Sequence, residues 1–341
     1  MLMIIDSSRR KLLKTGLIAG VSLPLLATGW TMPAIAGKIT TPTDKFRAKP
    51  GGKKEIYVCI GVHIDAVSGW IGTYGGQDSI RDITRGLFSG EVGIPRLLRL
   101  FKQWGIQQTF FAPGHSIETF PEQMNMIADG GHEIGAHGYT HENPIKMTRQ
   151  QEATVLDKSI ALIKNVSGQT PTGYVAPFWE FSKNTISLLL ERNFIYDHSM
   201  MQHDFIPYRL RKNLVWKKIN YKKAPEAWMI PATQGLETKL IEIPASWYMD
   251  DLPPFQFMDH LGGGGGYSDP YVIERMWKDR FDWMYREYDY AVYTLTIHPG
   301  VSGQAQNLLA LERLYDHIHG HKGVKFTTVN EIASDFSRRT V

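Results

Sequence analysis

Several side chains able to bind a metal or move a proton stand directly after short apolar segments of the chain. Asp65 and Asp197 each end one such segment, His298 ends another, and His137 and His141 form an HxxxH pair after a fourth. Two histidines at this spacing can reach one ion when the backbone turns helically, and one carboxylate completes a set that leaves positions open for water and substrate. Zinc, cobalt, nickel or ferrous iron suits such a set. Paired histidines are also common in cores and on surfaces, so the spacing by itself leaves both interpretations open.

The order of apolar segments and helical patterns predicts how these side chains are positioned. From residue 55 onward, short apolar runs alternate with amphipathic stretches, and helix starts are indicated at Pro121, Thr148 and Asp269. The runs predicted as strands are residues 56–65, 108–112, 133–137, 173–177, 194–197, 240–244, 290–298 and 324–328. No linker interrupts the alternation, so we predict one α/β domain over residues 55–341, a distorted (β/α) barrel of about seven parallel strands. Strand ends gather on one face of such a barrel, which places the chemical side chains in one pocket.

The first 36 residues have the composition of an export signal. Arg9 and Arg10 open a basic segment, residues 15–31 are almost free of charge, and Ala34-Ile35-Ala36 offers a cleavage site. We therefore predict a twin-arginine signal that is cut after Ala36 and a periplasmic or secreted location. A membrane anchor is the alternative, but the apolar run is short and interrupted by glycine and proline. Residues 37–54 are polar and aperiodic, and are predicted to be an arm or linker.

Charge and cysteine content exclude some classes of function. Four of the 38 Lys and Arg residues and one of the 34 acidic residues lie in residues 1–36, which leaves 34 basic and 33 acidic residues and a net charge of +1 in the rest. No strand or helix face gathers enough positive charge to indicate a nucleic-acid partner, and no stable membrane anchor is predicted after the signal. Cys59 is the single cysteine, so an internal disulfide is impossible.

Five short segments match, in order, the motifs of the polysaccharide deacetylase superfamily, the group with the NodB homology domain that includes carbohydrate esterase family 4. These segments are Gly61–Ala66, His137–His141, Tyr174–Pro177, Tyr196–Ser199 and Thr296–Pro299. More closely, the chain resembles the branch with peptidoglycan-deacetylase-like, allantoinase-like and cyclic-imide-hydrolase-like members. Gly114–Pro121 and Trp179–Ser182 carry that closer likeness. The resemblance extends over about residues 55–335, and it implies the NodB type of barrel.

The resemblance also implies roles for individual residues. It assigns one divalent ion, zinc before cobalt, nickel or iron, to Asp65, His137 and His141. It makes His298 the general acid for the leaving amine, tuned by Asp197. The implied activity is metal-dependent hydrolysis of non-peptide C–N bonds, foremost N-deacetylation of a polysaccharide or peptidoglycan. Hydrolysis of a cyclic imide, ureide or lactam is the alternative, and an inactive binding protein on the same fold is a second one. The resemblance further implies a homo-oligomer, a tetramer.

The chain departs from the family pattern at two positions. His63 stands where the first motif usually has the acid that serves as general base, and Ala176 stands where the third motif usually has an arginine. Residues two apart on a strand point to the same side, so His63 should share the pocket with Asp65. A neutral imidazole can take a proton from water, so we expect His63 to be the base. A fourth metal ligand and a spectator are the alternatives.

Other side chains near the predicted pocket could contact a substrate. The candidates are Trp70, Tyr74, Pro177, Trp179, Glu180 and Tyr248, with Phe178 and Trp247 beside them. Aromatic rings can stack on a sugar or a flat imide ring, although core packing is the alternative for each. Asp250 and Asp251 precede Leu252-Pro253-Pro254 and are expected to cap a loop. The tract of His317, His319 and His321 could bind metal but is expected to be a solvated helix end.

Overall fold

An apolar strand, β1 (Glu55–His63), lies inside the sheet, and all of its residues after Glu55 are buried. In the computed structural model, which describes residues 43–258 and 266–340, β1 pairs in parallel with β2, β8 and β9. In a curled parallel sheet, helices cover the outer face of such a strand, and side chains of the sheet itself fill the inner face. The predicted signal peptide and residues 37–42 lie outside the described residues.

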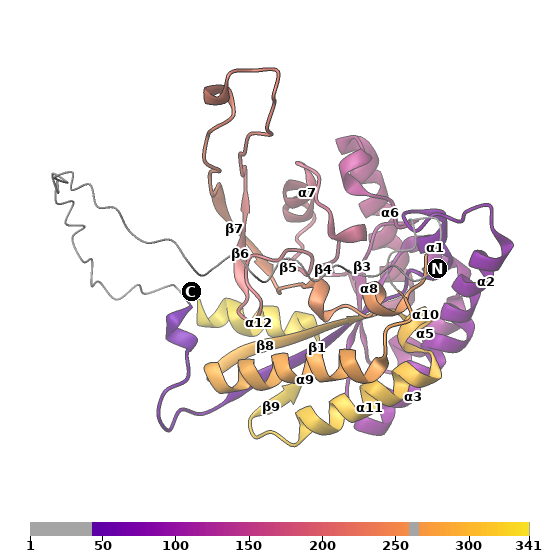
Figure 1. Ribbon diagram of the computed structural model, residues 1–341. Coiled ribbons are helices and arrows are strands. Elements are labelled where there is room, and N and C mark those ends of the chain that lie inside the picture. Colours follow the sequence, from indigo (N-terminus) through magenta and orange to yellow (C-terminus); the bar gives the residue numbers. More distant parts are fainter. Residues whose placement is uncertain (1–42, 259–265, 341) are drawn as a thin grey trace, which may run out of the picture. The chain divides into compact units, whose positions relative to one another are not determined.

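Nine strands form one curled sheet in the order β6-β7-β5-β4-β3-β2-β1-β8, with β9 beside β1 (Figure 1). The remaining strands are β2 Thr109–Ala112, β3 Glu133–Ala136, β4 Gly173–Tyr174, β5 Tyr196–Asp197, β6 Tyr208–Lys212, β7 Leu236–Glu242, β8 Tyr290–Ile297 and β9 Val324–Phe326. The predicted α/β fold with a distorted parallel barrel is confirmed, in the form of a half-barrel. Sequence reasoning missed β6 because it is a short strand in which Leu210 alone is buried, so it has no apolar run; β6 is antiparallel to β7.

The segment after β7 carries the curl of the sheet further. Asp250 forms an isolated parallel bridge with Thr296 of β8, and the Asp251 backbone N–H donates to the Thr296 carbonyl. An irregular stretch of chain thus lies beside β8 where another barrel strand would lie. This arrangement brings two acidic residues to the carboxyl end of β8.

Helices separate most of the strands and flank the sheet (Figure 1). They are α1 Ala66–Ile71, α2 Ile80–Phe88, α3 Ile94–Trp104, α4 Gly114–Thr119, α5 Pro121–Asp129, α6 Arg149–Ser167, α7 Thr185–Glu191, α8 Leu252–Phe255, α9 Pro270–Glu287, α10 Pro299–Ser302, α11 Ala305–His319 and α12 Val329–Arg339. The predicted starts are confirmed: Pro121 begins α5, Thr148 and Gln151 form a capping box on α6, and Asp269 caps α9. Within the described residues, no helix has the length and apolar character needed to cross a membrane.

Two segments lie outside the strands and helices of the barrel: the predicted arm before β1 and a hairpin between β6 and β7. Of the predicted arm, residues 43–54 contact the domain: the Phe46 ring lies 4.8 Å from that of Tyr290, and the Ala48 N–H donates to the Glu287 carbonyl. Between β6 and β7, residues 213–235 form a hairpin arm that projects from the sheet (Figure 1).

Asp197 and Glu242 form a buried acid pair where β5 and β7 adjoin. Both carboxyl groups accept a hydrogen bond from the Ser199 N–H, at 2.9 Å each. Burial raises the pKa of Asp197 to about 7, and burial together with the nearby Asp197 raises the pKa of Glu242 well above its ordinary value. The pair therefore retains a proton over a pH range in which exposed carboxyl groups have lost theirs.

The retained proton predicts a pH-dependent stability. Between pH about 4, where unfolded carboxyl groups titrate, and about 7, the folded chain binds more protons than the unfolded chain. The free energy of unfolding therefore falls as the pH rises through this window. In Glu242→Gln, the side-chain amide can donate to Asp197 without titrating. We expect the drop in Tm between pH 5 and pH 8, measured by circular dichroism, to shrink by several degrees.

The matched control is Glu237→Gln, a change at an exposed position of the same strand. It should leave the pH dependence of Tm unchanged. An equal slope in Glu242→Gln and the parent protein would contradict the assignment of the proton to the buried pair.

Candidate active site

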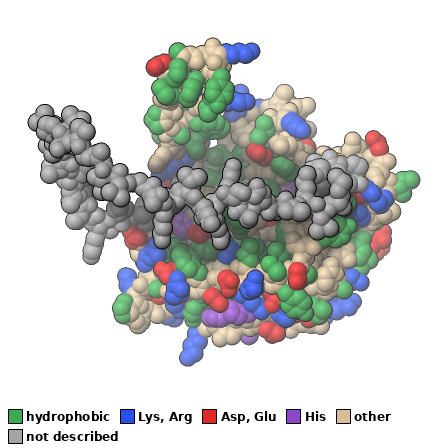
Figure 2. Space-filling model, viewed as in Figure 1, with side chains coloured by type: hydrophobic (Ala, Val, Ile, Leu, Met, Phe, Trp, Pro, Cys, Tyr) green, Lys and Arg blue, Asp and Glu red, His purple; other side chains and the backbone are tan. Residues whose placement is uncertain are grey.

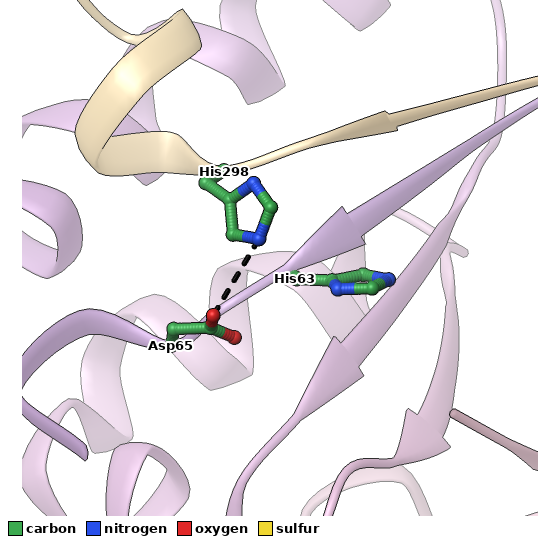
Figure 3. A group of neighbouring side chains, drawn as sticks. All are labelled: His63, Asp65 and His298. Carbon is green, nitrogen blue, oxygen red and sulfur yellow. Dashed lines mark ion pairs between the residues drawn. The ribbon is translucent and has the colours of Figure 1, made fainter. Parts of the chain in front are cut away.

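Asp65, His137, His141 and His298 converge at the carboxyl ends of β1, β3 and β8, and all four side chains are buried. Asp65 Oδ1 lies 3.2 Å from His137 Nε2, and Asp65 Oδ2 lies 3.2 Å from His141 Nε2. His298 Nε2 is 3.5 Å from Asp65 Oδ2, the pair drawn with a dashed line in Figure 3. The structure thus brings together the three predicted metal ligands and the predicted general acid.

The Nδ1 atoms of His137 and His141 are engaged in hydrogen bonds, which leaves both Nε2 atoms available to bind a metal ion. His137 Nδ1 donates to the Val175 carbonyl at 2.8 Å, and His141 Nδ1 is hydrogen-bonded to Thr73 Oγ1. The Nε2 atoms are thereby left facing Asp65, and His137 Nε2 and Asp65 Oδ1 are buried without a hydrogen-bond partner. Ligand atoms around a tetrahedral zinc ion lie about 3.3 Å apart, as its bond lengths require, which the 3.2 Å separations match. The residues therefore fit a divalent ion.

The loop between the two histidines is held in shape by Glu142. Its carboxylate accepts hydrogen bonds from the Tyr139 and Thr140 backbone N–H groups, at 2.9 and 2.6 Å. Gly138 and His141 both have positive φ, 66° and 56°. A left-handed conformation is unfavourable for a residue with a side chain, and such strain gathers where a site requires it. In this loop, the left-handed conformation turns the backbone so that the His141 side chain faces Asp65.

His298 is held by Asp251, and this corrects the pairing with Asp197 that the resemblance implied. His298 Nδ1 is 2.7 Å from Asp251 Oδ1, while Asp251 Oδ2 accepts from the His298 N–H and from Ser302 Oγ. Asp197 instead bonds to Ser199 and Glu242 on the other side of the sheet edge, at β5. Asp251 reaches His298 because its segment runs beside β8.

The electrostatics of His298 follow from this contact. Burial lowers the pKa of its imidazole, but Asp251 and Asp65 more than offset burial and raise the pKa well above its usual range. His298 therefore holds a proton that it can donate. Asp250 lies 3.6 Å from His298 Nδ1, and burial raises the pKa of its carboxyl group to about 7. Of the two residues expected to be loop caps, Asp250 does cap the following turn, because its Oδ1 accepts a hydrogen bond from the Leu252 N–H at 2.8 Å, and it also lies beside His298. The Asp251 side chain makes no cap bond and holds His298 instead.

His63 stands beside these groups at the end of β1 (Figure 3). Its ring centroid is 4.7 Å from that of His137 and 5.2 Å from that of His298, and its Nε2 has no hydrogen-bond partner. Burial, with His137 and His298 nearby, lowers the pKa of His63 well below its ordinary value. A neutral imidazole with a free nitrogen thus faces the pocket.

Aromatic and aliphatic side chains enclose a cavity of about 190 Å³ above these polar groups. Its apolar lining residues are Tyr74, Ala176, Phe178, Trp179, Trp247, Leu252 and Met258. Of the predicted substrate-binding residues, Tyr74 and Trp179 line this cavity, and Trp70 lines an adjoining cavity of about 720 Å³ that shares Asp65, Tyr74 and His298. Pro177, Glu180 and Tyr248 line neither cavity.

Tyr74 has a second role that the sequence did not indicate, because its hydroxyl donates a short hydrogen bond to Asp65. Asp250 and Asp251 were also missed as site residues. A signal for them exists, because two consecutive acids follow the strand-like run that ends at Pro244. The five-residue gap hides it, since the chain must first pass through Trp247–Met249 to reach β8.

Comparison with known proteins shows that the chain is similar to polysaccharide deacetylases. The family model of polysaccharide deacetylase matches residues 89–194. A peptidoglycan deacetylase of Helicobacter pylori is 58% identical over 286 residues, 84% of this chain and 98% of the relative. A peptidoglycan deacetylase-like protein of Gibberella zeae is 37% identical over 84% of this chain and 88% of the relative.

The fold agrees with solved structures. A Mycobacterium smegmatis protein assigned as a polysaccharide deacetylase superposes with a TM-score of 0.73 at 27% identity, over 87% of this chain and 95% of that one. The curled sheet, the Asp-His-His group at its strand ends and the near-complete match to the Helicobacter relative agree with one another. The chain belongs to the polysaccharide deacetylase family and is a hydrolase of non-peptide carbon–nitrogen bonds.

Proposed function

We propose that this chain removes acetyl groups from the N-acetylated sugars of peptidoglycan, with one divalent ion at Asp65, His137 and His141. The observation that carries the proposal is the meeting of these three residues with the Asp251–His298 pair in one pocket. The likeness to the Helicobacter peptidoglycan deacetylase supports the substrate class. Zinc is the first candidate for the ion, because two imidazoles and a carboxylate match its preferred ligands.

Each polar residue of the pocket has a distinct task in this proposal. A bound ion would polarise the amide carbonyl and make a water molecule more acidic. His63 Nε2, neutral and unpartnered, accepts the proton of the attacking water. His298 donates its proton to the sugar nitrogen as the amine leaves, and Asp251 fixes the ring so that Nε2 faces the pocket. Trp179 and Tyr74 wall the space that the acetyl group would occupy.

The proposal includes export. The twin-arginine pattern at Arg9 and Arg10 would carry the folded chain to the compartment that holds peptidoglycan, where the periplasmic or secreted form would lack residues 1–36. Mass spectrometry of the exported protein tests this, since an intact N-terminus would exclude cleavage after Ala36.

The proposal also includes self-association. The hairpin arm of residues 213–235 exposes large apolar side chains, which gather there in Figure 2, and monomeric proteins rarely leave such patches open. Its exposed apolar residues are Leu214, Val215, Trp216, Ile219, Tyr221, Met229 and Ile230. Light scattering of the purified protein would reveal the tetramer, and a monomer at micromolar concentration would exclude it.

The activity itself is tested by acetate release. Purified, metal-loaded protein should release acetate from peptidoglycan or N-acetylglucosamine oligomers. If it leaves both unchanged but opens dihydrouracil or succinimide, the substrate is instead a cyclic ureide or imide.

Removing a ligand should remove the ion. In His137→Ala and Asp65→Ala, elemental analysis should show loss of most of the metal, because each variant lacks one of three protein ligands. The control is Glu122→Gln, at an exposed position of α5, which keeps all three ligands and should retain an ion. A full equivalent of metal in both ligand variants would exclude the assignment.

Loss of the general acid should lower turnover while the ion stays bound. His298→Ala should lower kcat by about 10²- to 10⁴-fold, the usual scale for an acid–base group. Asp251→Asn should lower kcat by about 10- to 100-fold, as loss of an orienting partner does, with KM and metal content unchanged. Asp197→Asn is the matched control and should keep kcat near the parent value; a larger loss there than in Asp251→Asn would restore Asp197 as the partner of His298.

His63 can be tested as the base by separating metal binding from turnover. His63→Ala should keep its metal and lose most of its kcat, while His63→Asp, which places an acid at the usual family position, should recover part of it. Loss of metal in His63→Ala would identify a fourth ligand instead. An unchanged kcat would identify a spectator.

A further inference from the structure

A second group of metal-binding side chains lies on the outer surface, where the carboxyl-terminal parts of α9 and α11 pack together. It consists of Asp282 from α9 with His317 and His321 from α11 and the turn after it. The three side chains are partly exposed, at 49%, 29% and 28%. None of them lines the cavities beside Asp65.

The two imidazoles point their Nε2 atoms at the same carboxylate oxygen. His317 Nε2 is 2.6 Å from Asp282 Oδ1, and His321 Nε2 is 3.9 Å from it. His321 Nδ1 donates to the His317 carbonyl at 2.9 Å, so in neutral His321 the Nε2 lone pair is free and directed at Asp282. One histidine, His317, is enough to pair with Asp282. His321 also directs its Nε2 at this carboxylate, although at 3.9 Å it lies beyond hydrogen-bond distance.

Packing fixes this orientation. The His321 ring centroid lies 4.9 Å from that of Phe281 and 4.8 Å from that of Tyr285, and Tyr285 Oη donates to the Lys322 carbonyl next to His321. His319, between the two histidines in sequence, instead packs against Trp104 at 5.8 Å. The predicted solvated tract is therefore divided, with two histidines held toward Asp282 and one turned away.

We propose that Asp282, His317 and His321 bind a second divalent transition-metal ion, which links α9 to α11. Imidazole and carboxylate ligands suit zinc, nickel or copper, whereas calcium and magnesium require mostly oxygen ligands. Ligand atoms around a zinc ion lie about 3.3 Å apart, so binding would lengthen the 2.6 Å contact between His317 and Asp282 and shorten the 3.9 Å separation between His321 and Asp282, each by less than 1 Å. His317 lies in the last turn of α11, and the carboxyl end of a helix favours a cation. The site is independent of the proposed catalytic function.

Metal counting on untagged holoenzyme tests the proposal. Protein with its active-site ion in place is dialysed against a micromolar excess of zinc and then analysed for metal content. We expect two ions per parent chain and one in His317→Ala and in His321→Ala. His319→Ala is the matched control and should keep two, while His137→Ala should lose the active-site ion and keep the outer one. His137→Ala thus distinguishes loss of the ion at the active site from loss of the ion at the outer site.

Stability provides a second readout. Added zinc should raise the Tm of the parent holoenzyme by about 5 °C at a hundredfold excess over Kd, the shift expected of a ligand that binds only the folded state of a protein of this size. The shift should vanish in His317→Ala, whose acetate release without added zinc should equal that of the parent. One ion per parent chain, or an equal loss in His319→Ala, would overturn the proposal.

Discussion

The site depends on one buried charge, the carboxylate of Asp65, which is 2% exposed. A carboxylate in a protein interior is costly unless positive or hydrogen-bonding groups surround it. Burial raises the pKa of Asp65, but His141, His298 and His137 more than offset burial and hold this pKa well below its usual range. The Tyr74 hydroxyl also donates a hydrogen bond to the carboxylate. A divalent ion would complete that compensation, since Asp65 Oδ1 has no hydrogen-bond partner.

The backbone around Asp65 contains several residues in an unfavourable conformation. Ala66, His141, Phe178 and Trp179 all have positive φ between 45° and 60°, although none is glycine. These residues come from three separate loops, yet each lies in or beside the pocket. Strain of this kind persists only where surrounding structure fixes it. The parallel strands supply that support, because β1, β3 and β4, which precede these segments, end in buried residues.

The local sequence pattern correctly predicted features that depend on one segment of the chain alone. The apolar runs gave β1, β2, β3 and β8, and motif order placed Asp65, His137, His141 and His298 correctly in one pocket. The partner of His298 could not be predicted this way. Asp197 stands at a strand end as expected, but its carboxyl group turns to Glu242, whereas Asp251 reaches His298 only because an irregular segment lies beside β8. Such a segment has no periodicity for the sequence to reveal.

The histidine at position 63 lies in a pocket that already holds several carboxyl groups. Asp65, Asp250 and Asp251 bring three carboxyl groups within reach of His298, and crowding with burial already raises the pKa of Asp250 to about 7. A fourth acid would add to this repulsion. His63 adds no negative charge to the pocket, and burial together with the neighbouring histidines lowers the pKa of its imidazole well below the ordinary value. Position 63 thus adds no further carboxyl group to the three that already lie beside His298.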